Sequence, residues 1–259
     1  MTTALSGLAG EGGFRFGPEG QYCRDELAIR SHPVTRRKSS IMKNSTDEFA
    51  ARAAAALREV VSLPGACDRH RDSLTGLLDD RAMHRALTDA VEAAERAGAP
   101  IGLLFIDLDH FKNVNDRHGH VTGSRVLGQV AGFIDETAKK ARGFAARYGG
   151  DEFVVVLPGA DVDECLDNAE RLRATLAAII FAGGEPPERR PLVRVTCSIG
   201  VASVRPASSG DSAEAAGEGA ATRLLRLADD AMYQAKHAGR NRVAAADTHA
   251  ATAFSARVL

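Results

Sequence analysis

The chain has 259 residues, of which 44% are apolar and 26% charged, and its formal net charge at pH 7 is −1. These values are ordinary for a soluble globular protein of one or two domains. A net charge near zero gives no general attraction to nucleic acid or to an acidic membrane surface, and no apolar run reaches the ~18 residues that cross a bilayer. We therefore expect no nucleic-acid partner and no membrane partner.

The expected cellular location rests on two further features. The N-terminus lacks the basic start and apolar stretch of a signal peptide. The four cysteines, at positions 23, 67, 165 and 197, form no C-x-x-C pair and fit no zinc pattern. Scattered cysteines favour a reducing compartment, so we expect free thiols and a cytoplasmic protein.

The chain divides into an arm, a helix and one domain. Residues 1–45 are rich in Gly, Ser, Thr and charged residues without a sustained period, which predicts a mostly disordered arm. Residues 46–66 place apolar side chains on one helical face, which has to be buried against the domain or against a second copy of the chain. We expect a compact domain over 70–247 and a C-terminal tail over 248–259.

Within the domain, helical and strand periods alternate along the chain. Helices are predicted at 79–99, with Gly98 as the stop, and at 123–141, 161–181 and 222–239. Strands are predicted at 100–109, 191–204 and 240–246, with a hairpin at 143–159 and a polar loop at 206–220. Because the hairpin interrupts the alternation, we expect an α/β (α+β) domain in which helices pack on a mixed sheet.

Two acidic strand ends suggest a site. The first predicted strand ends in "FIDLD", and the stretch "RYGGDEFVVVLPG" sets Asp151 and Glu152 beside two glycines, which permit a positive φ and a close ligand. If this strand and the hairpin are neighbours, Asp107 meets both acids, and such carboxylates repel one another unless a cation joins them. Mg²⁺ is the natural partner of carboxylates and phosphate oxygens, and it lowers the pKa of an attacking hydroxyl.

Three cations indicate the same chemistry. Lys112 follows the first acids, and Lys236 and Arg240 lie one turn apart near a helix end. Cations that face a carboxylate–metal cluster are typical of a nucleoside triphosphate site. Each feature also has a structural alternative: acids at a strand end often cap a turn or helix, a Gly-Gly pair is often only a turn, and cations on a helix face are usually solvated. His118 and His120 are more often packing or turn residues than metal ligands.

Together, these stretches resemble the GGDEF family of diguanylate cyclases. The motifs occur in the family's order and spacing over about residues 70–245: "DSLTGLLDDR", "DLDHFKNVNDRHGHVTG", "RYGGDEF", "VTCSIGVA" and "ADDAMYQAKHAGRNRV". The resemblance implies a catalytic domain with the palm-like mixed sheet of class III nucleotide cyclases. It also implies condensation of two GTP to cyclic di-GMP and pyrophosphate by two chains that meet face to face as a homodimer.

The resemblance assigns roles to individual residues. It implies Mg²⁺ (or Mn²⁺) as cofactor, held by Asp107, the Leu108 carbonyl and Asp151. The base for the 3′-hydroxyl is expected from Asp151 and Glu152, and the corner at Gly149 and Gly150 is expected to leave room for the nucleotide. The expected substrate contacts are the backbone amides of His110 and Phe111, the triphosphate-binding side chains of Lys112, Lys236 and Arg240, and Asn115, His120 and Ser124 in the pocket for the base.

The chain departs from the family where guanine is recognised. The family's "GHxxGD" reads "GHVTGS" here, so that Ser124 stands in place of an Asp. A carboxylate accepts from the N1–H and amino group of guanine and repels the N1 acceptor of adenine, whereas a hydroxyl both donates and accepts. A subgroup with Ser at this place is similar here, and its members also accept ATP and make cyclic GMP-AMP. Two alternatives therefore stay open, GTP alone or GTP together with ATP.

Two other departures are smaller. The R-x-x-D product site of many members corresponds to Lys140 and Gly143 here, so we expect no feedback inhibition through it. The opening motif has Asp79-Asp80 in place of Asn-Arg, from which no functional conclusion follows.

A rival interpretation is a degenerate domain that acts as a nucleotide-binding adaptor. Such domains usually have broken acids or a broken Gly-Gly turn, and neither is seen here.

Overall fold

The computed structural model describes residues 70–183, 192–205, 219–246 and 256–258. The arm predicted at 1–45, the helix at 46–66, and most of both the loop at 206–220 and the tail at 248–259 lie outside these residues. None of the helices in the described part is both long and apolar enough to cross a membrane.

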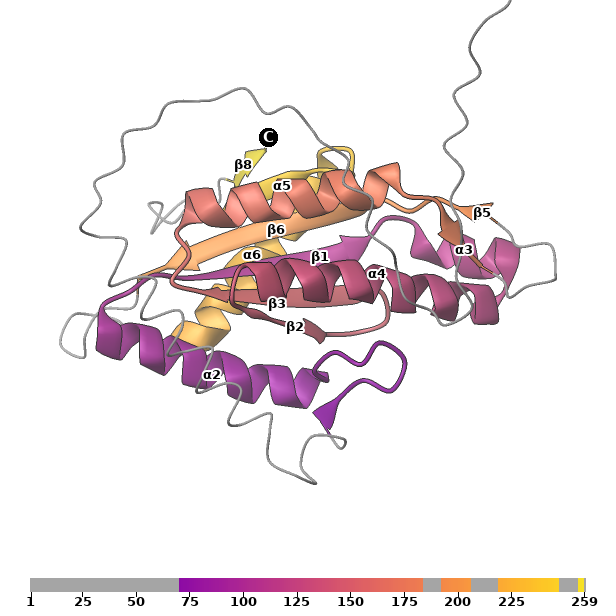
Figure 1. Ribbon diagram of the computed structural model, residues 1–259. Helices are drawn as coiled ribbons and strands as arrows, with labels where there is room; N and C mark the ends of the chain where they lie inside the picture. The colour runs from indigo at the N-terminus through magenta and orange to yellow at the C-terminus, as the bar shows by residue number, and fades with distance from the viewer. Residues whose placement is uncertain (1–69, 184–191, 206–218, 247–255, 259) are drawn as a thin grey trace, which may run out of the picture. The chain divides into compact units, whose positions relative to one another are not determined.

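Six strands form one mixed sheet in the order β2-β3-β1-β6-β7-β8 (Figure 1). The fully buried strand β1 (Ile101–Leu108) pairs antiparallel with β3 on one side and β6 on the other. Burial on both faces explains its nearly continuous apolar run. The other strands are β2 (Phe144–Arg147), β3 (Glu152–Pro158), β6 (Cys197–Val204), β7 (Val243–Ala246) and β8 (Ala256–Val258).

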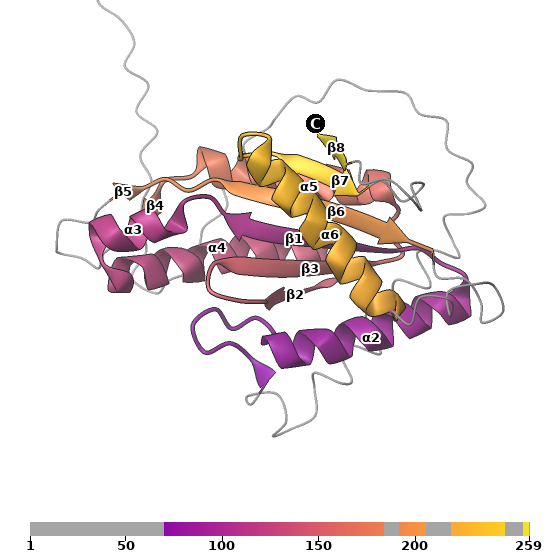
Figure 2. The same ribbon diagram turned by 180° about the vertical axis from the view of Figure 1, so that it is seen from behind.

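Helices cover both faces of the sheet (Figures 1 and 2). Helices α4 (His120–Lys140) and α5 (Val162–Ala178) pack on the face that carries Leu104 and Ile106 of β1. Helices α2 (Asp80–Ala97) and α6 (Ala220–His237) pack on the face that carries Leu103 and Phe105. The two cores therefore follow the two-residue period of β1. The architecture is the predicted mixed sheet flanked by helices.

Two predicted elements have different limits. The helix predicted at 161–181 ends at Ala178, and Phe181 lies in the short strand β4 (Phe181–Ala182), where its ring packs edge-on against Phe133. The single strand predicted at 191–204 is two strands, β5 (Leu192–Val193) and β6. Residues 194–196 between them are not in a strand, although the Thr196 carbonyl accepts a hydrogen bond from the amide of Asp109, the residue that follows β1.

One helix was not predicted. The eight residues of α3 (Phe111–His118) follow β1 directly and bury only Phe111 and Val114. So short a helix with a polar sequence gives little periodic signal. The Asp79-Asp80 departure has a local explanation as well, because the Asp79 side chain accepts from the Ala82 amide at 2.7 Å and caps α2.

Candidate functional site

The ends of β1, β3 and α6 meet in what we call the acidic corner, formed by Asp107, Asp151, Glu152 and Lys236. Asp107 lies opposite Glu152 in the β1–β3 ladder. The Leu108 amide donates to the Asp151 carbonyl at 3.2 Å. The ammonium of Lys236 lies 2.7 Å from a carboxylate oxygen of Asp107, which is only 8% exposed. The structure thus brings the acids of the two strand ends together and sets a cation against one of them.

The pKa values of both Asp107 and Glu152 are raised above their ordinary values. Burial raises the pKa of Asp107, the Lys236 ammonium opposes the rise, and the carboxylates of Asp151 and Asp109 add to it. Burial likewise raises the pKa of Glu152, and the negative charges of Asp107 and Asp151 add to this effect. A raised carboxyl pKa is typical of a group that binds a cation or acts as a general base.

The raised pKa of Glu152 predicts how stability depends on pH. As pH rises above the ordinary glutamate value of 4.5, the folded protein holds more protons than the unfolded chain, so the free energy of unfolding falls. The variant Glu152→Gln has no carboxyl group at this position, so its free energy of unfolding does not fall with pH for this reason. Its free energy of unfolding, relative to wild type, should therefore grow as pH rises from about 4 to 7, as measured by urea unfolding without added metal.

Glu170 on α5 is the control, because its pKa is shifted in the opposite direction from that of Glu152. Its hydrogen bonds with Arg173 lower its pKa, so its ionised form stabilises the fold above the ordinary pKa, and this stabilisation is lost as pH falls. Glu170→Gln should be less stable than wild type at neutral pH and approach it in acid. The same pH trend for both variants would contradict this account of the acidic corner.

The Gly-Gly corner does not use the positive φ that glycine permits, because neither Gly149 nor Gly150 has one. The two glycines matter here because they have no Cβ atom and so leave room around the corner. A Cβ on Gly149 would stand 2.9 Å from a carboxylate oxygen of Glu152, so only glycine leaves the Glu152 side chain in its place. A Cβ on Gly150 would meet nothing within 4 Å, which leaves this side of the corner open.

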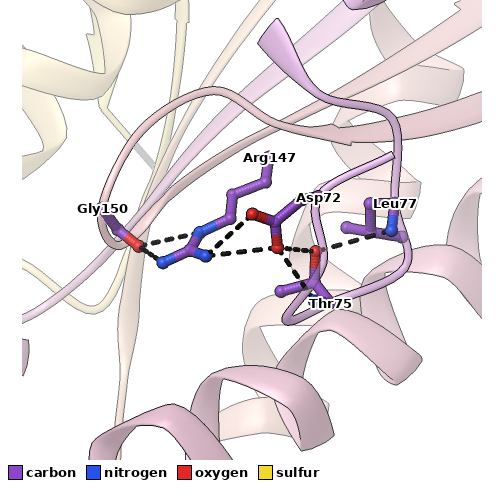
Figure 3. Close-up of polar contacts among 5 residues, drawn as sticks. All are labelled: Asp72, Thr75, Leu77, Arg147 and Gly150. Carbon is purple, nitrogen blue, oxygen red and sulfur yellow. Dashed lines mark hydrogen bonds and ion pairs between the residues drawn. The ribbon is translucent and has the colours of Figure 1, made fainter. Parts of the chain in front are cut away.

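The polar cluster behind this corner was not predicted (Figure 3). Arg147 donates to the Gly150 carbonyl at 3.1 and 2.6 Å and to both carboxylate oxygens of Asp72 at 3.2 and 3.1 Å. Asp72 also accepts from the amide and hydroxyl of Thr75. The cluster ties the loop before α2 to the acidic corner. Asp72 and Thr75 stand in the opening motif and Arg147 stands two residues before Gly149, but the pairing of Asp72 with Arg147 across 75 positions cannot be read from one sequence.

The start of α3 borders the acidic corner. His110 opens the helix in the left-handed region, with φ 56°, and Phe111 is buried and anchors the first turn. The first backbone N–H groups of a helix have no partner within it and attract an anion. The amides of His110 and Phe111 are thus placed just beyond Asp107 and Leu108, while the side chain of Lys112 is exposed.

The side chain of Asn115 on α3 rests against the first turn of α4. A Cβ on Gly123 would lie 1.9 Å from the side-chain oxygen of Asn115, so the amide group rests directly on the backbone of α4, one residue before Ser124. Glycine inside a helix costs about 1 kcal/mol relative to alanine. Close contact with Asn115 gives a reason for glycine at this position.

Three side chains that were expected to contact the substrate have no direct bond to the acidic corner among the described residues. In the described residues, no hydrogen bond or ion pair joins the side chains of Lys112, His120 or Arg240 to the acidic corner. His120 is the exposed first residue of α4. Arg240 follows α6 in a left-handed turn with φ 61°.

The donors of the acidic corner suit Mg²⁺. Carboxylate and carbonyl oxygens are the ligands that Mg²⁺ prefers, and it keeps other positions for water and phosphate. Within the described residues, no three His, Cys, Asp or Glu side chains are arranged to bind a metal by themselves. The expected set of Asp107, Asp151 and the Leu108 carbonyl is smaller. Burial, together with the carboxylates of Asp151 and Asp109, raises the pKa of Asp107, and a cation at this place would favour its charged form.

Curated proteins of known family are similar in sequence to much of this chain. The diguanylate cyclase DgcP of Pseudomonas aeruginosa is 38% identical over 173 residues, which are 66% of this chain and 23% of that protein. The response regulator PleD of Caulobacter vibrioides is 38% identical over 172 residues, 66% of this chain and 35% of that protein. The chain therefore matches well under half the length of these curated relatives.

Solved structures show the same fold. The GGDEF domain of DgcB from Caulobacter crescentus, in complex with c-di-GMP, has a TM-score of 0.61 and 34% identity, and the match covers 70% of this chain and 95% of that one. The active GGEEF domain of a diguanylate cyclase from Vibrio cholerae has a TM-score of 0.55 and 28% identity over 66% of this chain and 99% of that one. The family model described as "Diguanylate cyclase, GGDEF domain" matches residues 69–242, and the chain belongs to this family.

Proposed function

We propose that this protein condenses two nucleoside triphosphates to a cyclic dinucleotide, with GTP as substrate and cyclic di-GMP as product. The observation that carries the proposal is the acidic corner, where Asp107 and Glu152 face each other across paired strands and Lys236 contacts Asp107. Repelling carboxylates beside a cation suit metal-assisted transfer to a phosphate group. The family match supports the same chemistry.

In the proposed mechanism each chain binds one nucleotide and two chains meet face to face. The 3′-oxygen of one nucleotide attacks the α-phosphorus of the other, the bond to the β-phosphate breaks, and pyrophosphate leaves. Asp151 and Glu152 form the pair that takes the hydroxyl proton, and the burial that raises the pKa of Glu152 favours proton uptake. A second such transfer closes the ring, so two pyrophosphates leave for each product.

The other residues bind and orient the substrate. Mg²⁺ (or Mn²⁺), held by Asp107, Asp151 and the Leu108 carbonyl, would neutralise phosphate charge when bound. The amides of His110 and Phe111, with Lys112, Lys236 and Arg240, bind the triphosphate. Asn115, Ser124 and His120 line the pocket for the base, and Gly149 and Gly150 leave room for the nucleotide.

The second candidate is a mixed-substrate enzyme that also makes 3′,3′-cyclic GMP-AMP, and Ser124 is the observation that favours it. Ser124 lies in α4 directly after Gly123, whose backbone contacts the Asn115 side chain. Its hydroxyl is able to serve the donors of guanine or the acceptor of adenine. A site without the carboxylate lacks the repulsion that excludes adenine.

Product analysis separates these candidates. The full chain is incubated with Mg²⁺ and GTP, with ATP, or with an equal mixture, and products are identified by mass spectrometry. Cyclic di-GMP alone from the mixture supports GTP selectivity, and a large cyclic GMP-AMP fraction that Ser124→Asp abolishes supports the mixed-substrate enzyme. Nucleotide binding without any product would favour the adaptor, as would a cellular effect that survives Asp151→Ala or Glu152→Ala.

The contact between Gly123 and Asn115 gives a prediction for base recognition. Gly123→Ala should displace the Asn115 side chain and raise the KM for GTP about tenfold, although alanine is the better helix former. Gly132→Ala is the matched control in the same helix, because a Cβ there meets nothing within 4 Å. Equal kinetics for the two variants would contradict the role of Asn115.

Feedback through the R-x-x-D site is not expected. Lys140 lies in the last turn of α4 with its ammonium 2.9 Å from Glu136, and Gly143 supplies no carboxylate. Cyclic di-GMP added to the reaction should therefore inhibit only in competition with GTP. Inhibition that is noncompetitive and lost in Lys140→Ala would contradict this prediction.

A further inference from the structure

We propose that Asp109 is a positioning residue that fixes the turn carrying Arg240 against the end of β1. The inference rests on the proposed function, in which Arg240 binds the triphosphate. The two acids of "DLD" thus have separate tasks. Asp107 faces Lys236 and the acidic corner, whereas Asp109 engages the segment after α6 and the start of β6.

Asp109 is only 7% exposed, and its carboxylate accepts three hydrogen bonds. The hydroxyls of Thr196 and Ser198 donate at 2.6 and 2.7 Å, and the backbone amide of Asn241 donates at 3.0 Å. Burying a carboxylate is costly unless it is hydrogen-bonded, and bonds to an ionised acceptor are about twice as strong as neutral ones. Asp109 is therefore a strong and fixed anchor for the amide that directly follows Arg240.

The anchored turn has a backbone that needs support. Arg240 and Asn241 both have positive φ, 61° and 46°. This region is unfavourable for residues with a side chain, and such conformations persist where surrounding contacts hold them. Asp109 supplies one of these contacts, and Arg173 of α5 supplies another by donating to the Asn241 side chain at 2.8 Å.

Asp109 also connects the two groups that are expected to bind the triphosphate, the amides at the start of α3 and the Arg240 turn. Asp109 directly precedes His110, whose amide begins the series at the start of α3. Its carboxylate holds the Arg240 turn, and its own amide donates to the Thr196 carbonyl at 2.8 Å. One side chain thus sets the distance between the amides of α3 and Arg240.

The test compares a triphosphate with a monophosphate. Binding of 3′-deoxy-GTP, which lacks the attacking hydroxyl, and of GMP to the full chain is measured by calorimetry with Mg²⁺. Asp109→Ala should weaken 3′-deoxy-GTP binding about tenfold, and Asp109→Asn, which keeps an acceptor and the side-chain shape, about threefold. GMP binding should change less than twofold in both. Electrostatics alone predicts tighter rather than weaker binding of 3′-deoxy-GTP, because removing a negative carboxylate favours the binding of an anion.

A double-variant cycle shows whether Asp109 acts through Arg240. In an Arg240→Ala background, Asp109→Asn should cause no further loss of 3′-deoxy-GTP affinity. Equal losses for both nucleotides, additive losses, or tighter 3′-deoxy-GTP binding by Asp109→Asn would overturn the inference and leave the proposed function intact. If wild type binds neither nucleotide, the proposed function fails and the inference fails with it.

Discussion

Asp107→Asn should lower the rate of cyclic dinucleotide formation by about a thousandfold or more without lowering the stability of the fold. The rate falls because an amide is a poor ligand for Mg²⁺ and cannot balance its charge. Stability is spared because burial and the carboxylates of Asp151 and Asp109 disfavour the charge of Asp107 in the folded protein. Lys236, the other partner of the pair, has a flexible side chain that is 27% exposed, so its ammonium stays in contact with water when the carboxylate is lost. Residues placed for function rather than for stability often show this combination.

Two measurements check this prediction. Initial rates at saturating GTP give the loss of activity, and thermal unfolding of the metal-free protein should give a Tm equal to or above that of wild type. Asp167→Asn on the exposed side of α5 is the matched control and should leave both values unchanged. An Asp107→Asn variant with more than a tenth of wild-type activity would remove Asp107 from the site.

Lys236→Met should lower both activity and stability. The change leaves the carboxylate of Asp107 buried without its cation, and removing one partner of a buried pair is costly. Because the Lys236 side chain is 27% exposed, we expect a loss of about 2 kcal/mol rather than the full cost of a buried pair. Activity should fall about a hundredfold or more, because the proposed contact of Lys236 with the triphosphate is lost as well.

The control is Lys139→Met, the same change in the last turn of α4. Lys139 pairs with Asp135 on the surface and is 72% exposed, so its loss should have little effect. A cycle of Asp107→Asn and Lys236→Met should restore much of the lost stability in the double variant, since no charge is then left unpaired. Additive stability losses would show that the two side chains do not interact in solution.

The sequence was a good guide to the elements that have a strong period. The apolar run of β1, the hairpin signalled by two glycines and the amphipathic helices α2, α4 and α6 all lie close to their predicted limits. The acids at the ends of β1 and β3 could be expected to meet, because both stand next to buried strands. Ladder pairing between the two strands then aligns Asp107 with Glu152.

The rest depends on tertiary contacts that one sequence does not display. The partners of Asp109 lie 87, 89 and 132 positions away, and no local pattern distinguishes this acid from Asp107 two residues earlier. The tight fit of Gly123 under Asn115 follows from how α3 and α4 cross. Helix α3 is too short to give a clear periodic signal. The break before β6 lies where Thr196 contacts Asp109, a long-range contact that one sequence does not display.

We propose that the acidic corner performs nucleotidyl transfer between two substrates. The most direct measurement is the stoichiometry of the reaction of the full chain with GTP and Mg²⁺, with pyrophosphate and cyclic dinucleotide counted in the same samples. We predict two pyrophosphates for each cyclic dinucleotide, with both signals lost in Asp107→Asn and on chelation of the metal. Nucleotide consumption without a cyclic product, or synthesis that survives Asp107→Asn, would contradict the account.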